Sequence, residues 1–106
     1  MEERTWEVRI TRKAEKKARR LPKRALKAFE KLCADLADQG PVLPEWPNFS
    51  KIRGQKTHWH CHLSRGRPRY VACWRVETIA QKRLHTPKLS RFIVIYYVWT
   101  HEGAPY

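Results

Sequence analysis

Three histidines alternate in the segment His58-Trp59-His60-Cys61-His62, and this spacing is the feature of the chain that points most directly to chemistry. Side chains alternate between the two faces of a β-strand, so His58, His60 and His62 share one face if the segment is a strand. Imidazoles gain and lose protons near neutral pH. The pattern predicts a sheet face with proton-transfer groups; the plainer alternative is the polar solvent face of a strand.

A second group of reactive side chains ends the chain, in Thr100-His101-Glu102-Gly103-Ala104-Pro105-Tyr106. It follows an apolar segment expected to be a strand, and a strand end can hold His101 in place for proton transfer. Glu102 can orient that imidazole or contact RNA, and Tyr106 offers a ring to stack on a base and a hydroxyl to donate a hydrogen bond. The plainer alternative is a frayed tail.

Positive charge surrounds these groups. The chain has 23 Lys and Arg against 10 Asp and Glu, a net charge of +13. Such a charge predicts a polyanionic partner, and nucleic acid is favoured over an anionic membrane surface. Arginine suits phosphate because its planar guanidinium donates two parallel hydrogen bonds, although each arginine alone can be no more than solvated charge. The candidate phosphate contacts are Lys51, Arg53, Arg65, Arg67, Arg69, Arg75 and Arg91.

Metal and thiol chemistry are the alternatives for the same region. Two histidines at i and i+2 on a strand can bind zinc, with His101 as a third ligand. The chain has no CxxC or HExxH motif, so neither a metal nor a cofactor is expected. Cys33, Cys61 and Cys73 fall at apolar positions and are expected to be core residues.

The composition also bears on location. Three cysteines without a dense framework favour free thiols in a reducing cytoplasm. The longest apolar run, Phe92 to Trp99, is eight residues and too short to span a bilayer. The first residues lack the pattern of a signal peptide. We therefore expect a cytoplasmic protein with no membrane partner.

The elements that position the histidines begin with a short strand, because Trp6, Val8 and Ile10 alternate with charged residues. Thr11 can cap a helix over residues 12–20, and Pro22 suits the start of a second helix. That helix ends at Gly40-Pro41. Its apolar residues follow helical spacing: Leu26, Phe29, Leu32, Cys33 and Leu36.

Residues 41–50 contain three prolines and are expected to be an irregular loop that Trp46 and Phe49 pack onto the sheet. Three strands follow, at about 58–63, 70–76 and 92–99, and the last is expected to be central because it is apolar throughout. The connection 78–90, which includes His85, is expected to be a long, mobile, basic loop.

Together these elements predict a single domain, residues 1–106, of the α+β class. The order is β-α-α-β-β-β. The sheet is rich in antiparallel pairs, with a helical hairpin on one face and the histidines on the other.

The chain resembles the RelE/ParE toxin superfamily, the toxins of bacterial type II toxin–antitoxin pairs, and within it a RelE-like subgroup of cytotoxic translational repressors. The expected element order fits the same fold, which is similar to that of microbial ribonucleases. The segments that carry the resemblance are Lys51-Ile52-Arg53-Gly54, His60-Cys61-His62-Leu63, Gly66-Arg67-Pro68 running into Tyr70-Val71-Ala72, and the ending from Tyr97 to Tyr106.

The resemblance implies an mRNA interferase, an endoribonuclease that cuts messenger RNA in the A site of the 30S ribosomal subunit without a metal. A ribose 2′-hydroxyl attacks the adjacent phosphate and leaves a 2′,3′-cyclic phosphate. The resemblance also implies an acidic antitoxin as partner. The catalytic residues that it implies are His60, His62, His101 and Tyr106, with Arg53 and Arg91 stabilising charge on the phosphate.

The sequence departs from the family pattern at three places. Val71 stands where an arginine is usual, so Arg69, Arg75 or Arg91 would have to replace it. Trp99 is bulky and can block or reshape the site, and the connection 78–90 is longer than the usual turn. A non-catalytic ParE-like toxin, or an RNA-binding module on the same fold, is therefore the alternative.

Overall fold

The protein is described from a computed structural model that covers residues 6–83 and 86–106, with side chains described outside 81–89. The elements are β1 (Glu7–Ile10), α1 (Arg12–Ala18), α2 (Lys23–Gln39), β2 (Ser50–Lys51), β3 (His58–His62), β4 (Tyr70–Arg83), β5 (Thr86–Thr100) and the 3-10 turn η1 (His101–Gly103). The strands form one mixed sheet in the order β1-β5-β4-β3-β2, in which β1 is parallel to β5 and the other pairs are antiparallel. The predicted α+β class is confirmed, and the two-residue strand β2 was not expected.

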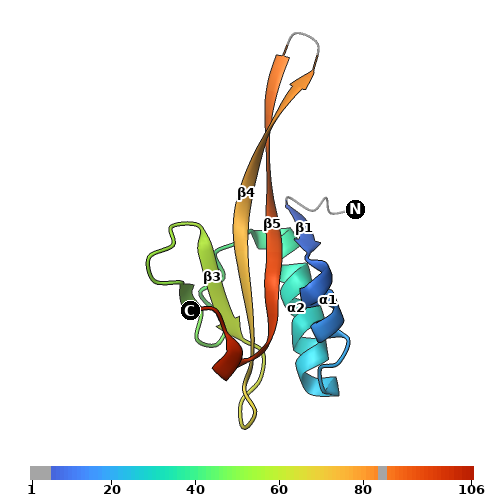
Figure 1. The fold of residues 1–106 in the computed structure, drawn as a ribbon, viewed down its shortest axis with the longest axis vertical. Helices are drawn as coiled ribbons and strands as arrows, with labels where there is room; N and C mark the ends of the chain where they lie inside the picture. The colour runs from blue at the N-terminus through green and yellow to red at the C-terminus, as the bar shows by residue number, and fades with distance from the viewer. Residues whose placement is uncertain (1–5, 84–85) are drawn as a thin grey trace.

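Both helices cover the same face of the sheet (Figure 1). The Thr11 hydroxyl accepts a hydrogen bond from the Ala14 N–H at 3.2 Å, which confirms the predicted cap of α1. Gly40 ends α2 with φ 93°, and a Cβ there would lie 2.8 Å from the indole nitrogen of Trp6. This position therefore requires glycine, because other residues rarely adopt a positive φ and because a side chain would collide with Trp6. Neither α1 nor α2 is long and apolar enough to cross a membrane, as far as the described residues go.

The core lies between these helices and the sheet. Trp74 is completely buried, and its indole N–H donates to the Pro41 carbonyl at 3.0 Å. Phe49 stacks on Trp74 with 6.1 Å between ring centroids, as the sequence predicts. The helix residues Ala14, Ala18, Leu32 and Leu36 and the strand residues Trp59, Cys61, Ile93 and Ile95 belong to the same buried cluster.

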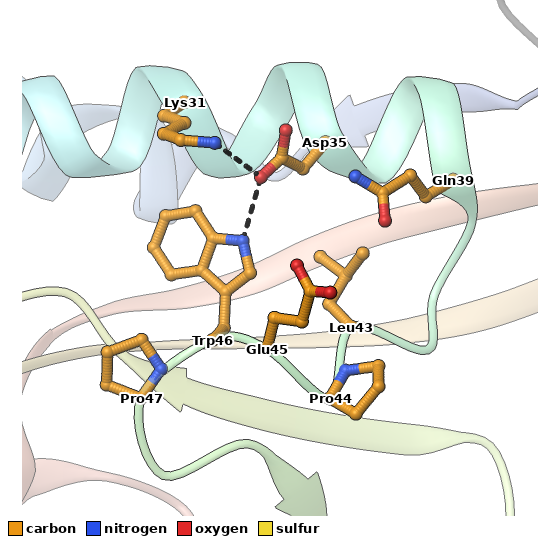
Figure 2. A pocket seen from close by; sticks show the side chains of 8 residues that line it. All are labelled: Lys31, Asp35, Gln39, Leu43, Pro44, Glu45, Trp46 and Pro47. Carbon is orange, nitrogen blue, oxygen red and sulfur yellow. Dashed lines mark hydrogen bonds and ion pairs between the residues drawn. The ribbon is translucent and has the colours of Figure 1, made fainter.

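Trp46 packs against the same buried cluster, which includes residues of the strands, and it also binds α2. Its indole N–H donates to the carboxylate of Asp35 on α2 at 2.9 Å, and the same oxygen binds the Lys31 ammonium at 3.0 Å (Figure 2). At this residue a polar contact to α2, which the sequence did not predict, gives the half-buried indole N–H its acceptor. A groove of about 400 Å³ lies between Trp46, Leu43 and α2.

The prediction of a long loop over 78–90 is wrong. Strands β4 and β5 stay paired from Thr78↔Arg91 out to Arg83↔Thr86. Only residues 84 and 85 connect them, so the chain needs no long loop here. His85 lies outside the described residues. We call the paired segments 78–83 and 86–91 the arm; Figure 1 shows it extending beyond the other strands.

Candidate active site

The three alternating histidines lie on the sheet face that the helices leave uncovered. Trp59, Cys61 and Leu63 point into the core, so the predicted alternation along β3 is confirmed. On the other face, His60 pairs with Cys73 and His62 pairs with Val71 of β4. The inward positions are filled by large apolar groups, and this fixes the register that keeps the imidazoles outside.

Two of these histidines meet the C-terminal segment. The centroid of the His62 ring lies 5.4 Å from that of His101, and the Tyr106 ring stacks on His60 at 4.1 Å with an interplanar angle of 19°. The ring centroids of His60 and His62 lie 6.4 Å apart, and those of His101 and Tyr106 lie 5.9 Å apart. These four side chains, His60, His62, His101 and Tyr106, are called the histidine cluster.

The C-terminal segment reaches this face because three local contacts turn it back. The His101 N–H donates to the Arg69 carbonyl at 2.8 Å, and the Ala104 N–H closes η1 on the His101 carbonyl at 3.1 Å. The Tyr97 hydroxyl donates to the Thr100 carbonyl at 2.7 Å. A Cβ at Gly103 would lie 2.9 Å from that hydroxyl oxygen. The turn therefore depends on glycine for close packing.

His60 is the most enclosed member of the cluster, with 9% of its surface exposed. Its Nε2 lies 2.8 Å from the Ser50 hydroxyl, whereas its Nδ1 is buried without a hydrogen-bond partner among the described residues. Burial, and then the neighbouring His62 and His101, lower the pKa of His60. The ring is therefore held neutral, and its enclosure suits a positioning role beneath Tyr106.

His62 combines access with a perturbed environment. Burial lowers its pKa first, followed by the charges of His101 and Arg69. Its backbone N–H donates to the Pro47 carbonyl at 2.8 Å, which holds the end of β3 against the loop. The side chain borders an open groove of about 710 Å³. Other residues lining this groove are Glu45, Asn48, Ser64, Arg65 and Arg69.

The predicted phosphate contacts divide into two groups. Arg65 and Arg69 line the groove beside His62, and the charge of Arg69 acts on the His62 imidazole. Lys51, Arg53 and Arg67 are exposed, and none of them lines this groove. Arg53 lies in the turn that follows β2, where it is separated from the groove residues of the β3–β4 turn.

Arg91 and Arg75 do not join the cluster. Arg91 pairs with Thr78 in the arm and lies over the Trp6 ring at 5.1 Å. Thr78 is seven residues along β4 from Val71, about 23 Å at the rise of a strand. The expectation that Arg91 stabilises phosphate charge beside the histidines is therefore wrong. The Arg75 guanidinium binds the Glu77 carboxylate at 2.7 Å.

Two further expectations concern side chains near the cluster. Trp99 packs edge-to-face against Tyr70, with 5.4 Å between ring centroids, and lies beneath the Lys17 ammonium of α1 at 4.6 Å. Because its contacts are to α1 and Tyr70, it does not fill the cluster. Glu102 is exposed, and no hydrogen bond or ion pair joins it to His101 in the described part of the chain.

His58 forms a separate pair that sequence reasoning missed. Its Nδ1 lies 3.0 Å from the Tyr96 hydroxyl. Burial raises the pKa of Tyr96 to about 12, so the phenol stays protonated and can donate to the imidazole. Burial and then Arg75 lower the pKa of His58. A register shift between Cys73 and Trp74 brings Tyr96 to this place, and such a bulge has no clear sequence signal.

The three cysteines, Cys33, Cys61 and Cys73, do not have the surroundings of reactive thiols. Cys61 and Cys73 are buried and Cys33 is half-buried, and all three are free. Burial raises the pKa of Cys33 to about 11 and that of Cys73 to about 12, and it also raises that of Cys61. The thiols stay protonated and act as core groups. In residues 6–83 and 86–106, no three His, Cys, Asp or Glu side chains are placed to share a metal ion.

No protein-family model, curated protein or solved structure matches this chain. The geometry of the histidine cluster and its groove therefore carries the functional argument.

Proposed function

We propose that the protein is a RelE-type toxin, an endoribonuclease whose active centre is the histidine cluster. The observation that supports this most strongly is the distance of 5.4 Å between the ring centroids of His62 and His101, together with the groove that His62 lines with Arg65 and Arg69. Cleavage by a ribose 2′-hydroxyl needs a base, an acid and a cation near one phosphate. These three kinds of group are present together.

The roles follow from the surroundings of each side chain. His62 has a lowered pKa, so it is neutral at neutral pH and can accept the 2′-hydroxyl proton. His101 is exposed beside it and can protonate the leaving 5′ oxygen. Arg69 supplies positive charge for the phosphorane. The products are a 2′,3′-cyclic phosphate on one fragment and a 5′-hydroxyl on the other, with no net consumption of water.

The other two members of the cluster support these groups. Tyr106 has 43% of its surface exposed, which leaves part of its ring free to contact a nucleotide. Burial raises the pKa of Tyr106 to about 12, so its hydroxyl acts as a hydrogen-bond donor. His60 holds the Tyr106 ring by stacking and is itself held by Ser50. Its place in the proposal is therefore positioning.

The substrate and partner in this proposal come from the family resemblance and from the charge. Messenger RNA in the 30S A site is the proposed substrate, and a small acidic antitoxin is the proposed partner. A net charge of +13 supports attraction to both. The non-catalytic ParE-like alternative shares these attractions and differs only in needing no histidine chemistry.

The test expresses the wild type, His62→Gln and His58→Gln in a bacterium and maps the 5′ ends of messenger RNA. His58→Gln is the matched control, because it removes the same side chain from the same strand outside the cluster. We expect new 5′-hydroxyl ends with the wild type and the control, and their loss with His62→Gln. Growth arrest without new ends, unchanged by His62→Gln, would instead support the non-catalytic alternative.

A further inference from the structure

We propose that the groove between α2 and the loop 41–50 binds one guanine base. Its volume of about 400 Å³ lies within the range of pockets that hold small molecules, roughly 300–1,000 Å³. We call it the α2 groove, and its lining includes Lys31, Asp35, Gln39, Leu43, Glu45 and Trp46. Binding of a base in this groove does not depend on cleavage by the histidine cluster.

Trp46 forms a fixed aromatic wall of the α2 groove (Figure 2). The Asp35 carboxylate holds its indole N–H at 2.9 Å. Its backbone N–H donates to the Leu43 carbonyl at 3.0 Å, and its carbonyl accepts from the Phe49 N–H at 3.1 Å. Trp46 is half-buried, so part of the ring stays accessible from the groove. A planar base can therefore pack against an indole that is already ordered.

Two polar side chains of the α2 groove are free to bind a ligand. Figure 2 shows Gln39 reaching into the groove from α2 and Glu45 reaching into it from the loop. Both are exposed, and neither forms a hydrogen bond or an ion pair with any residue that the structure describes. Asp35 differs, because one of its oxygens already binds Lys31 and Trp46. The groove therefore offers Glu45 as a carboxylate acceptor and Gln39 as an amide donor.

These two groups match the edge of guanine better than the edges of the other bases. Guanine presents N–H donors at two neighbouring atoms, the ring N1 and the 2-amino group, beside the O6 acceptor. The Glu45 carboxylate can accept both N–H groups in parallel, as a carboxylate does from a guanidinium. The Gln39 amide can donate to O6. Adenine, cytosine and uracil lack two neighbouring donor atoms, so they would leave one carboxylate oxygen without a partner.

The α2 groove continues into the groove beside His62. The two grooves share Glu45 and Pro47 as lining residues, and the Pro47 carbonyl accepts the backbone N–H of His62 at 2.8 Å. A strand whose guanine lies in the α2 groove can therefore place a neighbouring phosphate beside Arg65 and Arg69. These arginines meet the phosphate charge, so only the neutral base lies against the Glu45 carboxylate. A free guanine nucleotide presents the same base, and the test separates the two sources.

The test measures binding of GMP, IMP, AMP, CMP and UMP to the protein by isothermal titration calorimetry. IMP keeps the N1–H and O6 groups of guanine and lacks only the 2-amino group. The variant that removes the acceptor is Glu45→Gln. The matched control is Glu30→Gln, which removes an exposed carboxylate from α2 outside the groove. Both glutamates are exposed, so both variants should unfold cooperatively like the wild type.

We expect the wild type and Glu30→Gln to bind GMP about tenfold more tightly than each of the other four nucleotides, and Glu45→Gln to lose this preference. Trp46→Leu should weaken binding of all five by about tenfold, because stacking on an aromatic ring does not distinguish between bases. Equal affinities of the wild type for the five nucleotides, no measurable binding of GMP, or an unchanged preference in Glu45→Gln would overturn the proposal.

A second measurement identifies the source of the base. It compares GMP with a single-stranded RNA pentamer that has one central guanine, in the His62→Gln variant so that the RNA stays intact. If an RNA strand supplies the base, the pentamer should bind about tenfold more tightly than GMP, and Arg65→Gln/Arg69→Gln should remove this gain. GMP that binds as tightly as the pentamer would identify a free nucleotide as the source.

Inosine in place of guanine should weaken the tighter of these two ligands by about tenfold, and an unchanged affinity would show that the α2 groove does not bind guanine. The outcomes also separate this site from the histidine cluster. Guanine binding without RNA cleavage would contradict the proposed function alone. RNA cleavage by a protein that binds the five nucleotides equally would contradict guanine binding alone.

Discussion

The backbone N–H of His101 donates to the carbonyl of Arg69 at 2.8 Å, and this bond joins the start of η1 to the start of β4. Because β3 pairs with β4 directly after this point, the bond brings the C-terminal segment onto the face that carries His60 and His62. The histidine cluster is therefore assembled from the ends of two strands, β3 and β5, that lie on either side of the start of β4. Its geometry depends on the turn at η1 as much as on the histidines.

The turn can be tested at Gly103. Gly103→Ala places a Cβ 2.9 Å from the Tyr97 hydroxyl oxygen, so either the tail or the tyrosine must move. We expect about a tenfold loss of RNA cleavage, equivalent to one hydrogen bond of about 1.4 kcal/mol. Removing the hydroxyl as well, in Gly103→Ala/Tyr97→Phe, creates room for the methyl group. The double variant should cleave RNA faster than Gly103→Ala does. If removing the hydroxyl instead lowers the rate further, the contact between residue 103 and the Tyr97 hydroxyl does not cause the loss.

The stacking of Tyr106 on His60 predicts that the tyrosine ring matters more for cleavage than the tyrosine hydroxyl does. Tyr106→Phe keeps the ring that lies 4.1 Å from His60, whereas Tyr106→Ala removes it. If stacking holds the cluster together, Tyr106→Ala should reduce cleavage by about tenfold more than Tyr106→Phe, since aromatic pairs contribute about 0.5–1.5 kcal/mol. Single-turnover cleavage rates measure this difference. Equal rates for the two variants would show that the ring has no positioning effect.

Stability should decrease at acid pH because three imidazoles have lowered pKa values in the folded state. The pKa values of His58, His60 and His62 are lowered from 6.5 in the folded state, so the unfolded chain takes up these protons first. The free energy of unfolding should therefore change little from these groups above pH 6.5 and fall as the pH drops below it. Urea unfolding from about pH 7.5 to 5.5 measures the fall. His60→Gln should show a smaller fall, and an equal or larger one would contradict this assignment.

Trp74 provides a prediction for the core. Trp74→Phe removes the indole N–H that is bonded to Pro41 and leaves that carbonyl without this partner. We expect a loss of about 1–3 kcal/mol in the free energy of unfolding. Trp46→Phe is the matched control, because Trp46 also loses an indole hydrogen bond but is only half-buried. Denaturant unfolding should show the larger loss for Trp74→Phe.

Local signals in the sequence predicted much of this fold. The cap at Thr11 and the glycine at position 40 act within one turn of their helices, and the alternation of β3 depends only on which side chains are apolar. The arm was missed because its pairing joins residues that come together across a hairpin, while its basic residues and Pro87 resemble those of a loop. Pairing of that kind has no local signal.

The candidate site was predicted less completely than the fold. The family resemblance predicts that His101 and Tyr106 lie near β3. The stacking of Tyr106 on His60 and the hydrogen bond between His60 and Ser50 arise from tertiary packing. The separation of Arg91 from the cluster follows from the length of β4 and β5, which the sequence pattern understated. The catalytic roles of these residues stay predictions until cleavage is measured.

The central claim is that His62 and His101 act on the same phosphate, and single-turnover cleavage of messenger RNA bound to ribosomes tests it most directly. His62→Gln and His101→Gln should each lower the rate by about 10²–10⁴-fold. Because the two groups act in one step, the double variant should lose much less than the product of the single losses. His58→Gln should cleave at the wild-type rate, and all active variants should leave 2′,3′-cyclic phosphate ends. Cleavage by the double variant at the wild-type rate would contradict the account.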